Sequence, residues 1–365
     1  MKFNIKKKSG KARSGTLTLK HGTVQTPAFM TVGTYGSVKS LTNQDLLECN
    51  AEIILCNAYH LMIRPERSLI EKAGGLHKFM NWSRPILTDS GGYQVFSLSS
   101  QTKVSKDGVE FKSPLNGNKL FMSPEKSIET QIYLGSDIMM IFDECTPYPS
   151  SKIETEKSME LSLYWAEMSY KANNSKMPLF GIIQGGMYPD LREISLNELI
   201  KYDFEGYALG GLSVGEPDHI RKEVIEDIGY KLPDDKPRYL MGVGKPLDII
   251  HAVKNGIDMF DCVIPTRNAR NSQLFSFDGK INIRNAKYKN DFSPIDNNSF
   301  SLISNAYSKA YLHHLFKTNE VLGLRIATEH NLKFYIHLME KVRQKIKDDC
   351  FEPWAKDFIK RYNNE

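Results

Sequence analysis

The chain has 365 residues, of which 41% are hydrophobic and 25% are charged. This composition is typical of a globular protein and excludes disordered, collagen-like and fibrous chains. The formal net charge of +5 is a mild excess of Lys and Arg over Asp and Glu, which allows a nucleic-acid partner without requiring one.

The five cysteines are scattered, so the sequence indicates neither a disulfide framework nor a Cys-x-x-Cys metal site. They are Cys49, Cys56, Cys145, Cys262 and Cys350. The lysine-rich N-terminus lacks the apolar stretch of a signal peptide, and no run approaches the ~18 apolar residues of a membrane span. We therefore expect a cytoplasmic protein without a membrane segment.

Eight short apolar runs, each ending in a polar or glycine-containing loop, are the candidate strands. They span residues 28–32, 53–56, 85–88, 138–142, 179–183, 206–209, 238–243 and 259–264. Most are followed by helical periodicity, as in 123–135, where Ser123 suits the N-cap and Pro124 the first turn. Strands that alternate with helices pair in parallel, so we expect an α/β fold, a (β/α)8 TIM barrel, with a doubly wound open sheet as the alternative.

Two stretches interrupt this alternation and are typical of β-hairpins. Residues 103–122 contain Asp107-Gly108 and Asn116-Gly117, and residues 276–282 contain Asp278-Gly279. Residues 305–364 are almost wholly helical. Their periodicity predicts one buried face with Tyr307, Ala310, Tyr311, His314 and Leu315, and a second with Phe334, His337, Leu338, Val342 and Ile346.

The residues that directly follow the candidate strands are unusually polar and glycine-rich. Asp89, Asp143, Gln184 and Gly210-Gly211 come after strands, and Asp261 lies within the last run. In a barrel the active site forms at the C-terminal ends of the strands, so these residues should face one axis. A single Asp there often only caps the next helix, but three carboxylates in one mouth favour a catalytic site.

Two carboxyl groups on different strands permit a double displacement at a sugar carbon, in which one attacks and the other transfers a proton. Asp143, Gln184 and the Gly210-Gly211 backbone suit the edge of a purine-like base, and Tyr93 and Met241 could cover its faces. The alternative is that these are ordinary core and turn residues.

A basic segment follows the last candidate strand. Arg267 and Arg270, together with Lys245, could bind phosphates or bases, although solvated surface groups are the alternative.

Several motifs at these positions resemble the bacterial tRNA-guanine transglycosylases. They are LTDSGGYQVF at 87–96, FDEC at 142–145, IQGG at 183–186, YALGGL at 207–212, YLMGVGKP at 239–246 and GIDMFDCV at 256–263. The resemblance covers nearly the whole chain. It implies an irregular (β/α)8 barrel with β-hairpin insertions and a helix-rich zinc-type subdomain, and exchange of the wobble guanine of tRNAs for Asp, Asn, His and Tyr for 7-aminomethyl-7-deazaguanine.

The resemblance also assigns roles to residues. Asp261 would be the nucleophile that forms a covalent intermediate with the ribose, and Asp89 the general acid/base. The implied base-binding residues are Ser90, Gly91, Gly92, Tyr93, Asp143, Gln184, Gly211, Leu212 and Met241. The implied RNA-binding residues are Gly242, Val243, Gly244, Lys245, Pro246, Leu247, Asp248, Thr266, Arg267, Asn268, Ala269 and Arg270.

The implied organisation has three parts: a catalytic barrel over 1–272, an inserted subdomain over 273–330, and C-terminal helices over 331–365 that pack on the barrel. The implied partners are a tRNA anticodon loop, a 7-deazaguanine and a second copy of the chain in a homodimer.

The sequence departs from the family at the zinc site. Relatives carry Cys-x-Cys-x-x-Cys followed by His, whereas this chain has Ser299, Ser301 and Ser304 there and keeps only His330. Because a serine hydroxyl stays protonated and binds zinc poorly, we expect no metal and no cofactor. Apolar packing by Phe300, Leu302 and Ile303 should then hold the subdomain together. A second departure is Ser272, where the family often has glycine.

Three other interpretations remain. A non-catalytic tRNA-binding subunit of the same fold is possible, but the presence of both Asp89 and Asp261 argues against it. A queuine-salvaging variant is disfavoured because the branched Val214 leaves less room beside the base. A metal-dependent barrel hydrolase needs a His and Asp cluster at the strand ends, where His60 is the only histidine.

Overall fold

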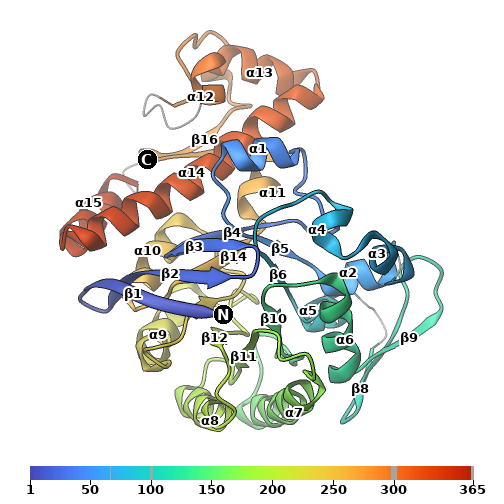
Figure 1. Cartoon of the computed structure of the whole chain (residues 1–365). Coiled ribbons are helices and arrows are strands. Elements are labelled where there is room, and N and C mark those ends of the chain that lie inside the picture. Colours follow the sequence, from blue (N-terminus) through green and yellow to red (C-terminus); the bar gives the residue numbers. More distant parts are fainter. Residues whose placement is uncertain (66, 99–101, 297–301, 363–365) are drawn as a thin grey trace.

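The computed structural model describes residues 1–365 except 66, 99–101, 297–301 and 363–365 (Figure 1). Its centre is a parallel sheet with the strand order β10-β11-β12-β13-β14-β4-β5-β6. These strands are β4 (Ala28–Val32), β5 (Ile54–Cys56), β6 (Ile86–Thr88), β10 (Met139–Met140), β11 (Leu179–Ile183), β12 (Gly206–Leu209), β13 (Arg238–Leu240) and β14 (Met259–Cys262). A parallel bridge between Leu87 and Ile138 joins the two ends, which confirms the predicted barrel rather than an open sheet.

Several strands are shorter than the apolar runs that predicted them. The run 238–243 stops pairing at Leu240, because Gly242 turns the backbone with a φ of 70°. The run 259–264 ends at Cys262, since α11 (Ile264–Arg270) begins two residues later. The run 138–142 contributes Met139 and Met140 to β10 and Ile138 to the bridge with Leu87, and all five of its side chains are buried.

Three backbone hydrogen bonds close the seam between β6 and β10, from Thr88 N to Ile138 O, from Asp137 N to Ile86 O and from Ile138 N to Ile86 O. Buried side chains add to them. The Gln131 side chain accepts a hydrogen bond from Met140 N (2.8 Å) and donates to Met140 O (2.9 Å). Its Oε1 also accepts from the Thr88 hydroxyl at 3.0 Å. The Asp137 carboxylate accepts from Ile86 N at 2.9 Å. These buried side chains therefore add to the few backbone hydrogen bonds beside the two-residue strand β10.

Helices surround the barrel, as the alternation predicted. They are α1 (Asn43–Glu48), α2 (Ala58–Ile63), α3 (Arg67–Ala73), α4 (Leu76–Phe79), α5 (Gly92–Leu98), α6 (Pro124–Leu134), α7 (Lys152–Ala172), α8 (Pro189–Ile200), α9 (Asp218–Ile228), α10 (Pro246–Lys254) and α11. The predicted N-cap of α6 is confirmed, with Pro124 in the first turn. The Ser123 side chain accepts from Lys126 N, and Gly135 ends the helix in the left-handed conformation with a φ of 77°.

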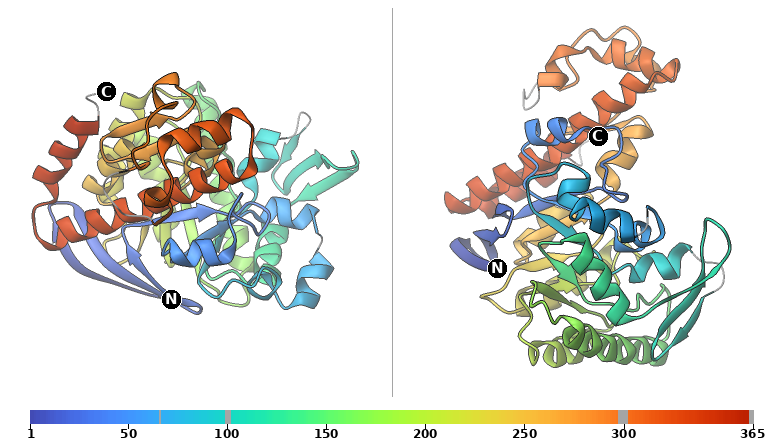
Figure 2. Two further views of the ribbon diagram at one scale, coloured as in Figure 1. Left: turned by 90° about the horizontal axis from the view of Figure 1, so that it is seen from above. Right: turned by 45° about the vertical axis from the view of Figure 1, so that its right-hand side comes forward.

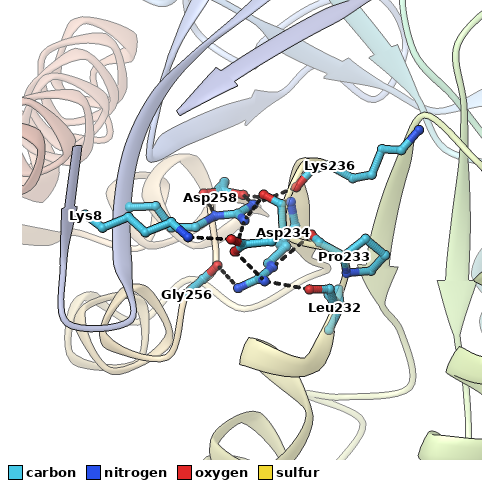
Figure 3. A network of polar contacts seen from close by, with 9 residues as sticks. Lys8, Leu232, Pro233, Asp234, Lys236, Gly256 and Asp258 are labelled. Atoms are coloured by element: carbon cyan, nitrogen blue, oxygen red, sulfur yellow. Dashed lines mark hydrogen bonds and ion pairs between the residues drawn. The ribbon is translucent and has the colours of Figure 1, made fainter. Parts of the chain in front are cut away.

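An antiparallel sheet that the sequence did not predict precedes the barrel. It consists of β1 (Lys2–Ser9), β2 (Ala12–Leu19) and β3 (Gly22–Thr26). The buried Arg13 on β2 pairs with the buried Asp258 just before β14. Asp258 also accepts from Arg238 N, and Asp234 accepts from Arg238 and Lys8 (Figure 3). This network ties the sheet to the start of β13 and β14.

The two predicted hairpin regions are confirmed. The first forms β7 (Lys103–Ser105), β8 (Gly108–Lys112) and β9 (Lys119–Met122), which pair in antiparallel order. The second forms β15 (Gln273–Ser276) and β16 (Gly279–Asn282), with a turn at Phe277 and Asp278.

The C-terminal helices are α12 (Leu302–Ala306), α13 (Lys309–Lys317), α14 (Val321–Lys347) and α15 (Phe351–Tyr362). The long helix α14 contacts α12 and α13 near one end and β1 and β2 farther along (Figure 2). Its predicted buried face is confirmed, with His337 half-buried. In the described part of the chain, no helix is long and apolar enough to cross a membrane.

The predicted buried face of α13 is partly wrong. Tyr311 and His314 are exposed, whereas Leu312, His313 and Phe316 are buried. The apolar cluster beneath the helix contains Leu312, Leu315 and Phe316. His313 can be buried because its Nδ1 lies 2.7 Å from Ile283 O, which gives the polar ring a partner.

The seam geometry predicts that Gln131→Met destabilises the fold. The substitution keeps the side-chain volume but leaves Met140 N and Met140 O buried without their partner, which should lower the free energy of unfolding by about 3 kcal/mol. Urea unfolding measures this change. The control Glu129→Gln on the exposed side of the same helix should change it by less than about 0.5 kcal/mol. Equal stability of both variants would show that Gln131 does not hold the seam.

Candidate active site

Polar residues gather where the barrel strands end at their carboxyl termini. Asn57 directly follows β5, Asp89 follows β6 and Gln184 follows β11. Asp143 lies three residues beyond β10, and Asp261 is the third residue of β14. Because all these strands are parallel, their carboxyl ends open at one mouth of the barrel.

Asp89 is held by donors from the neighbouring strand end. Its Oδ2 accepts from the Asn57 side chain at 2.5 Å, and its Oδ1 accepts from Ala58 N at 2.9 Å. Burial raises the pKa of Asp89 to about 8, and the negative charges of Asp261 and Asp143 add to the rise, against the hydrogen bond from Ala58. Asp89 therefore holds a proton at neutral pH, as a general acid must.

Asp261 is half-buried, and its Oδ1 receives two hydrogen bonds. One comes from the hydroxyl of the buried Tyr239 at 2.6 Å and the other from Gly242 N at 2.8 Å. Burial raises the pKa of Asp261, while these two hydrogen bonds oppose the rise by stabilising the carboxylate. Tyr239 and Gly242 thus fix the orientation of the carboxylate and leave its Oδ2 directed away from them.

Asp143 and Gln184 form a buried pair. The Gln184 side-chain amide donates to Asp143 Oδ2 at 2.7 Å, and the Ser90 hydroxyl donates to Asp143 Oδ1 at 3.4 Å. Burial raises the pKa of Asp143 to about 6, against the hydrogen bonds from Gln184 and Ser90. At neutral pH the carboxylate is therefore largely ionised and can accept N–H donors of a ligand.

Glycine is required beside both members of this pair. A Cβ on Gly211, whose φ is 64°, would lie 2.4 Å from Gln184 Oε1, and a Cβ on Gly92 would lie 2.5 Å from Asp143 O. Gln184 Oε1 is buried and has no hydrogen-bond partner among the described residues. An unpaired buried acceptor next to an ionised carboxylate is a group that a ligand donor would satisfy.

The remaining predicted base-binding residues lie at the same end of the barrel. Gly91 adopts a φ of 83° between Ser90 and α5. Tyr93 on α5 is exposed, and Met241 directly after β13 is half-buried. Leu212 is buried after β12.

The predicted RNA-binding segment 242–248 forms the loop between β13 and α10 and the first turn of α10. Its exposed Lys245 pairs with Asp218 at 2.9 Å. The buried Asp248 pairs with Arg221 at 2.7 Å, and Arg221 also contacts Glu216 and Asp218. The network fixes the start of α10 beside α9. Of the other residues of this segment, Gly242 is exposed, Leu247 is half-buried, and Val243, Gly244 and Pro246 are buried.

The second predicted RNA-binding segment is α11, which follows β14 and hence Asp261. Arg267 is exposed, and the half-buried Arg270 donates to Thr266 O at 2.8 Å. Asn268 is half-buried and donates to the Gln273 side chain, whereas Thr266 and Ala269 are buried. The helix therefore presents Arg267, Arg270 and Asn268 outward from a buried side.

Two residues of the site were missed by the sequence reasoning. Asn57 is the first residue after a candidate strand, so the signal that pointed to Asp89 and Gln184 applied to it as well. Tyr239 lies within a buried strand, where nothing in the sequence distinguishes its phenol from a core aromatic.

At the family zinc position, Ser304 and His330 are described, whereas Ser299 and Ser301 lie outside the described residues. The Ser304 hydroxyl is 2.7 Å from His330 Nδ1, and His330 Nε2 is 2.8 Å from Phe275 O. Burial lowers the pKa of His330, so its ring is neutral, with Nε2–H donating to Phe275 and Nδ1 accepting from Ser304. These described residues do not fit a zinc site, since a serine hydroxyl takes up the ring nitrogen that faces it.

Comparison with known proteins agrees with this geometry. The family model described as Queuine tRNA-ribosyltransferase matches residues 8–364. The chain belongs to this family. It is 54% identical over 368 aligned residues to the queuine tRNA-ribosyltransferase of Vibrio vulnificus (strain YJ016), with 100% of this chain and 97% of the relative covered. The Idiomarina loihiensis relative of the same name is 53% identical over 361 residues, covering 99% and 97%.

The raised pKa of Asp89 predicts that Asp89→Asn stabilises the fold of this family member. Between about pH 4 and about pH 8 the folded chain retains a proton that the unfolded chain releases, so the free energy of unfolding falls as the pH rises. Asparagine removes this penalty and should gain on the order of 2 kcal/mol at neutral pH. Urea unfolding across the pH range should show a gain that grows with pH.

The exposed Asp278→Asn variant is the control, and it should change the free energy of unfolding by less than about 0.5 kcal/mol. A stability of Asp89→Asn that equals or falls below that of the unsubstituted chain throughout the range would show that Asp89 ionises freely in the fold.

Proposed function

We propose that this chain is a tRNA-guanine transglycosylase that exchanges the wobble guanine of the tRNAs for Asp, Asn, His and Tyr for 7-aminomethyl-7-deazaguanine. The proposal is carried by two acidic residues at one mouth of the barrel: Asp89, whose pKa burial raises to about 8, and Asp261, which Tyr239 and Gly242 orient. Asp143 and Gln184 lie at the same mouth. Full-length similarity to queuine tRNA-ribosyltransferases supports the same activity.

In the first displacement, Asp261 Oδ2 attacks C1′ of the ribose on the face opposite guanine. The C1′–N9 bond breaks, its electron pair goes to the base, and Asp89 transfers its proton to the departing nitrogen. Guanine leaves neutral, and the ribose remains bonded to Asp261. Tyr239 and Gly242 hold the other oxygen of Asp261 during the attack.

In the second displacement, the 7-deazaguanine binds where guanine was. The Asp89 carboxylate takes the proton from its ring N–H, and the nitrogen attacks C1′ while the bond to Asp261 breaks. Two inversions give net retention, so the product is again a β-nucleoside. Asp89 is protonated again, and both carboxyl groups return to their starting states.

Selection of the base rests on Asp143. Ionised Asp143 suits the adjacent N–H donors on a guanine-like edge, with the Gln184 amide and the Gly211 backbone beside it and Ser90, Gly91, Gly92 and Leu212 forming the wall. Tyr93 and Met241 would cover the faces of the base. We expect Val214, whose N–H donates to Glu216 as that of Ser213 does, to lie beside this wall and to favour the smaller base over queuine.

The RNA partner is the anticodon loop, whose unpaired bases can be splayed out and read singly. Segments 242–248 and 266–270 flank Asp261 in the chain, and their exposed Lys245 and Arg267 supply the positive charge for phosphates. A homodimer in the cytoplasm, where tRNA is found, completes the proposal. Light scattering of the purified chain tests its oligomeric state.

The proposed function predicts that Asp261→Asn abolishes exchange. The purified chain should incorporate radiolabelled guanine into cognate tRNA. The amide introduced by the substitution cannot form the ribosyl ester, so incorporation should fall by at least about a thousandfold. Binding of tRNA, which depends on other groups, should stay close to that of the unsubstituted chain.

The unsubstituted protein with a tRNA lacking the wobble guanine is the blank. Absence of incorporation by the unsubstituted protein would favour the alternative of a non-catalytic tRNA-binding subunit. Full activity of Asp261→Asn would remove the covalent step from the mechanism.

We also propose that the subdomain over residues 273–330 folds without the zinc ion of its relatives. Ser304 and Phe275 occupy both ring nitrogens of His330, and Asn331 holds Phe275 N at 3.0 Å. Ile303 packs on the apolar cluster that includes Leu312 and Phe316, while Phe300 lies outside the described residues. We therefore propose that hydrogen bonds as well as apolar packing stabilise this subdomain, for which the sequence predicted packing alone.

This proposal predicts that dialysis against a chelator leaves the subdomain folded. The amide protons of β15, β16 and α13 should keep their protection from hydrogen exchange, because no metal contributes to their stability. Guanine exchange should be unchanged as well. A selective loss of protection in these elements, restored by one equivalent of zinc, would contradict the proposal. The matched variant carrying cysteine at positions 299, 301 and 304 restores the family ligand set and should lose protection with the chelator.

A further inference from the structure

A cluster of two histidines and an aspartate lies outside the active site. His21 belongs to the turn between β2 and β3, His77 to α4, and Asp137 to the segment that enters β10. Among the described residues this is the one group of three metal-ligating side chains whose ligand atoms all lie within 4.8 Å of one another. None of the three has a part in the proposed reaction.

The three side chains converge on one carboxylate. His21 Nδ1 lies 2.8 Å from Asp137 Oδ1, and His77 Nε2 lies 3.2 Å from Asp137 Oδ2. The two imidazole rings stack with their centroids 3.7 Å apart and an interplanar angle of 24°. Each ring therefore directs one nitrogen at its own oxygen of the same carboxylate.

These separations are close to those of ligands around a metal. Zinc bonds of about 2.1 Å to nitrogen and oxygen at a tetrahedral angle place the two ligand atoms about 3.4 Å apart. The observed 2.8 and 3.2 Å are within about 0.6 Å of that value, so small rotations would admit a cation. Imidazole nitrogen and carboxylate oxygen are ligands that zinc accepts.

The surroundings hold the Asp137 carboxylate in place. Ile86 N donates to Asp137 Oδ2 at 2.9 Å and orients the carboxylate from outside the cluster, as a second shell does in metal sites. Arg84 O, 3.1 Å from His77 Nε2, adds one more oxygen.

Access to the cluster comes from the amino-terminal end of the barrel. The His21 side chain is 28% exposed, whereas that of Asp137 is fully buried. The His77 side chain is 12% exposed. A hydrated ion can thus reach the two imidazoles from solvent and keep a water as its last ligand.

We propose that His21, His77 and Asp137 form a binding site for one divalent transition-metal ion of the zinc class. The ion would replace the protons that the two imidazoles share with the carboxylate. It would link the β2–β3 turn and α4 to the start of β10. Since Asp137 also holds Ile86 N at the seam, the bound ion would stabilise barrel closure. The site lies at the opposite end of β6 from Asp89, so the chemistry at Asp261 does not depend on it.

The test is calorimetric titration of chelator-treated, untagged protein with zinc chloride. One equivalent should bind saturably, with release of protons that shows as a dependence of the heat on the buffer. His21→Ala should weaken binding more than about tenfold, because even an outer-shell partner contributes 10- to 100-fold. Zinc should raise the melting temperature of the unsubstituted protein but not that of His21→Ala.

Two controls separate this site from others. His219→Ala removes an exposed histidine elsewhere, and Ser304→Ala alters the family zinc position; both should keep the bound equivalent. His21 lies in a partly exposed turn, so its variant should fold even if His77→Ala does not. The proposal fails if the unsubstituted protein shows no saturable binding, or if His21→Ala binds zinc as the unsubstituted protein does.

Discussion

The arrangement of the active site depends on how the barrel closes between β6 and β10. Closure places Asp89 at the end of β6 in the same mouth as Asp143 beyond β10, and the ladder there is a single bridge between Leu87 and Ile138. The side chains of Gln131 and Asp137, which lie outside the strands, accept further hydrogen bonds from Met140 N and Ile86 N. Because such buried hydrogen bonds have strict geometry, they specify one register where a longer ladder would otherwise do so. A shift of register at this seam would move Asp89 away from Asp143 and Gln184.

The buried acidic side chains at the mouth of the barrel oppose folding. Three carboxyl groups lie close enough that Asp261 and Asp143 raise the pKa of Asp89, and burial raises the pKa of all three. Each shift means that the fold disfavours the charged form. The opposite end of the barrel is arranged differently, since Arg13 compensates the buried Asp258 directly. Asp89, Asp143 and Asp261 thus concentrate buried acidity at the end where a substrate can use it, which is the pattern expected of a catalytic site.

Much of this could be predicted from sequence because two signals are local. Buried parallel strands read as unbroken apolar runs, and the residue after each run faces the mouth, which identified Asp89 and Gln184. Tyr239 could not be found in this way, because a strand buried on both faces carries no alternation that marks a functional side. The predicted buried face of α13 was partly wrong, because a periodicity counts Tyr311 and Phe316 alike. Only the packed structure distinguishes them. Ser272 adopts a φ of 65°, which accounts for the glycine that relatives often have there.

The long-range features lay beyond sequence reasoning altogether. The pairing of Arg13 with Asp258 and the meeting of His21 with Asp137 join residues more than a hundred positions apart, and no local pattern marks them.

In the proposed zinc-free subdomain, hydrogen bonds and apolar packing around His330 would take over the role of the metal ion. A zinc site concentrates folding free energy in four bonds, and removal of the ion usually unfolds the segment. Here the histidine that relatives use is buried among Ser304, Phe275 and Asn331, and each contact contributes only about 1 kcal/mol. The balance must come from apolar burial, and the cluster beneath α13 supplies it. That cluster contains Ala269, Leu274, Ile283, Tyr288, Ile295, Leu312, Leu315, Phe316, Ile326 and Ala327. Distributed support of this kind is lost by degrees as side chains are truncated, whereas a zinc site fails when one ligand is removed.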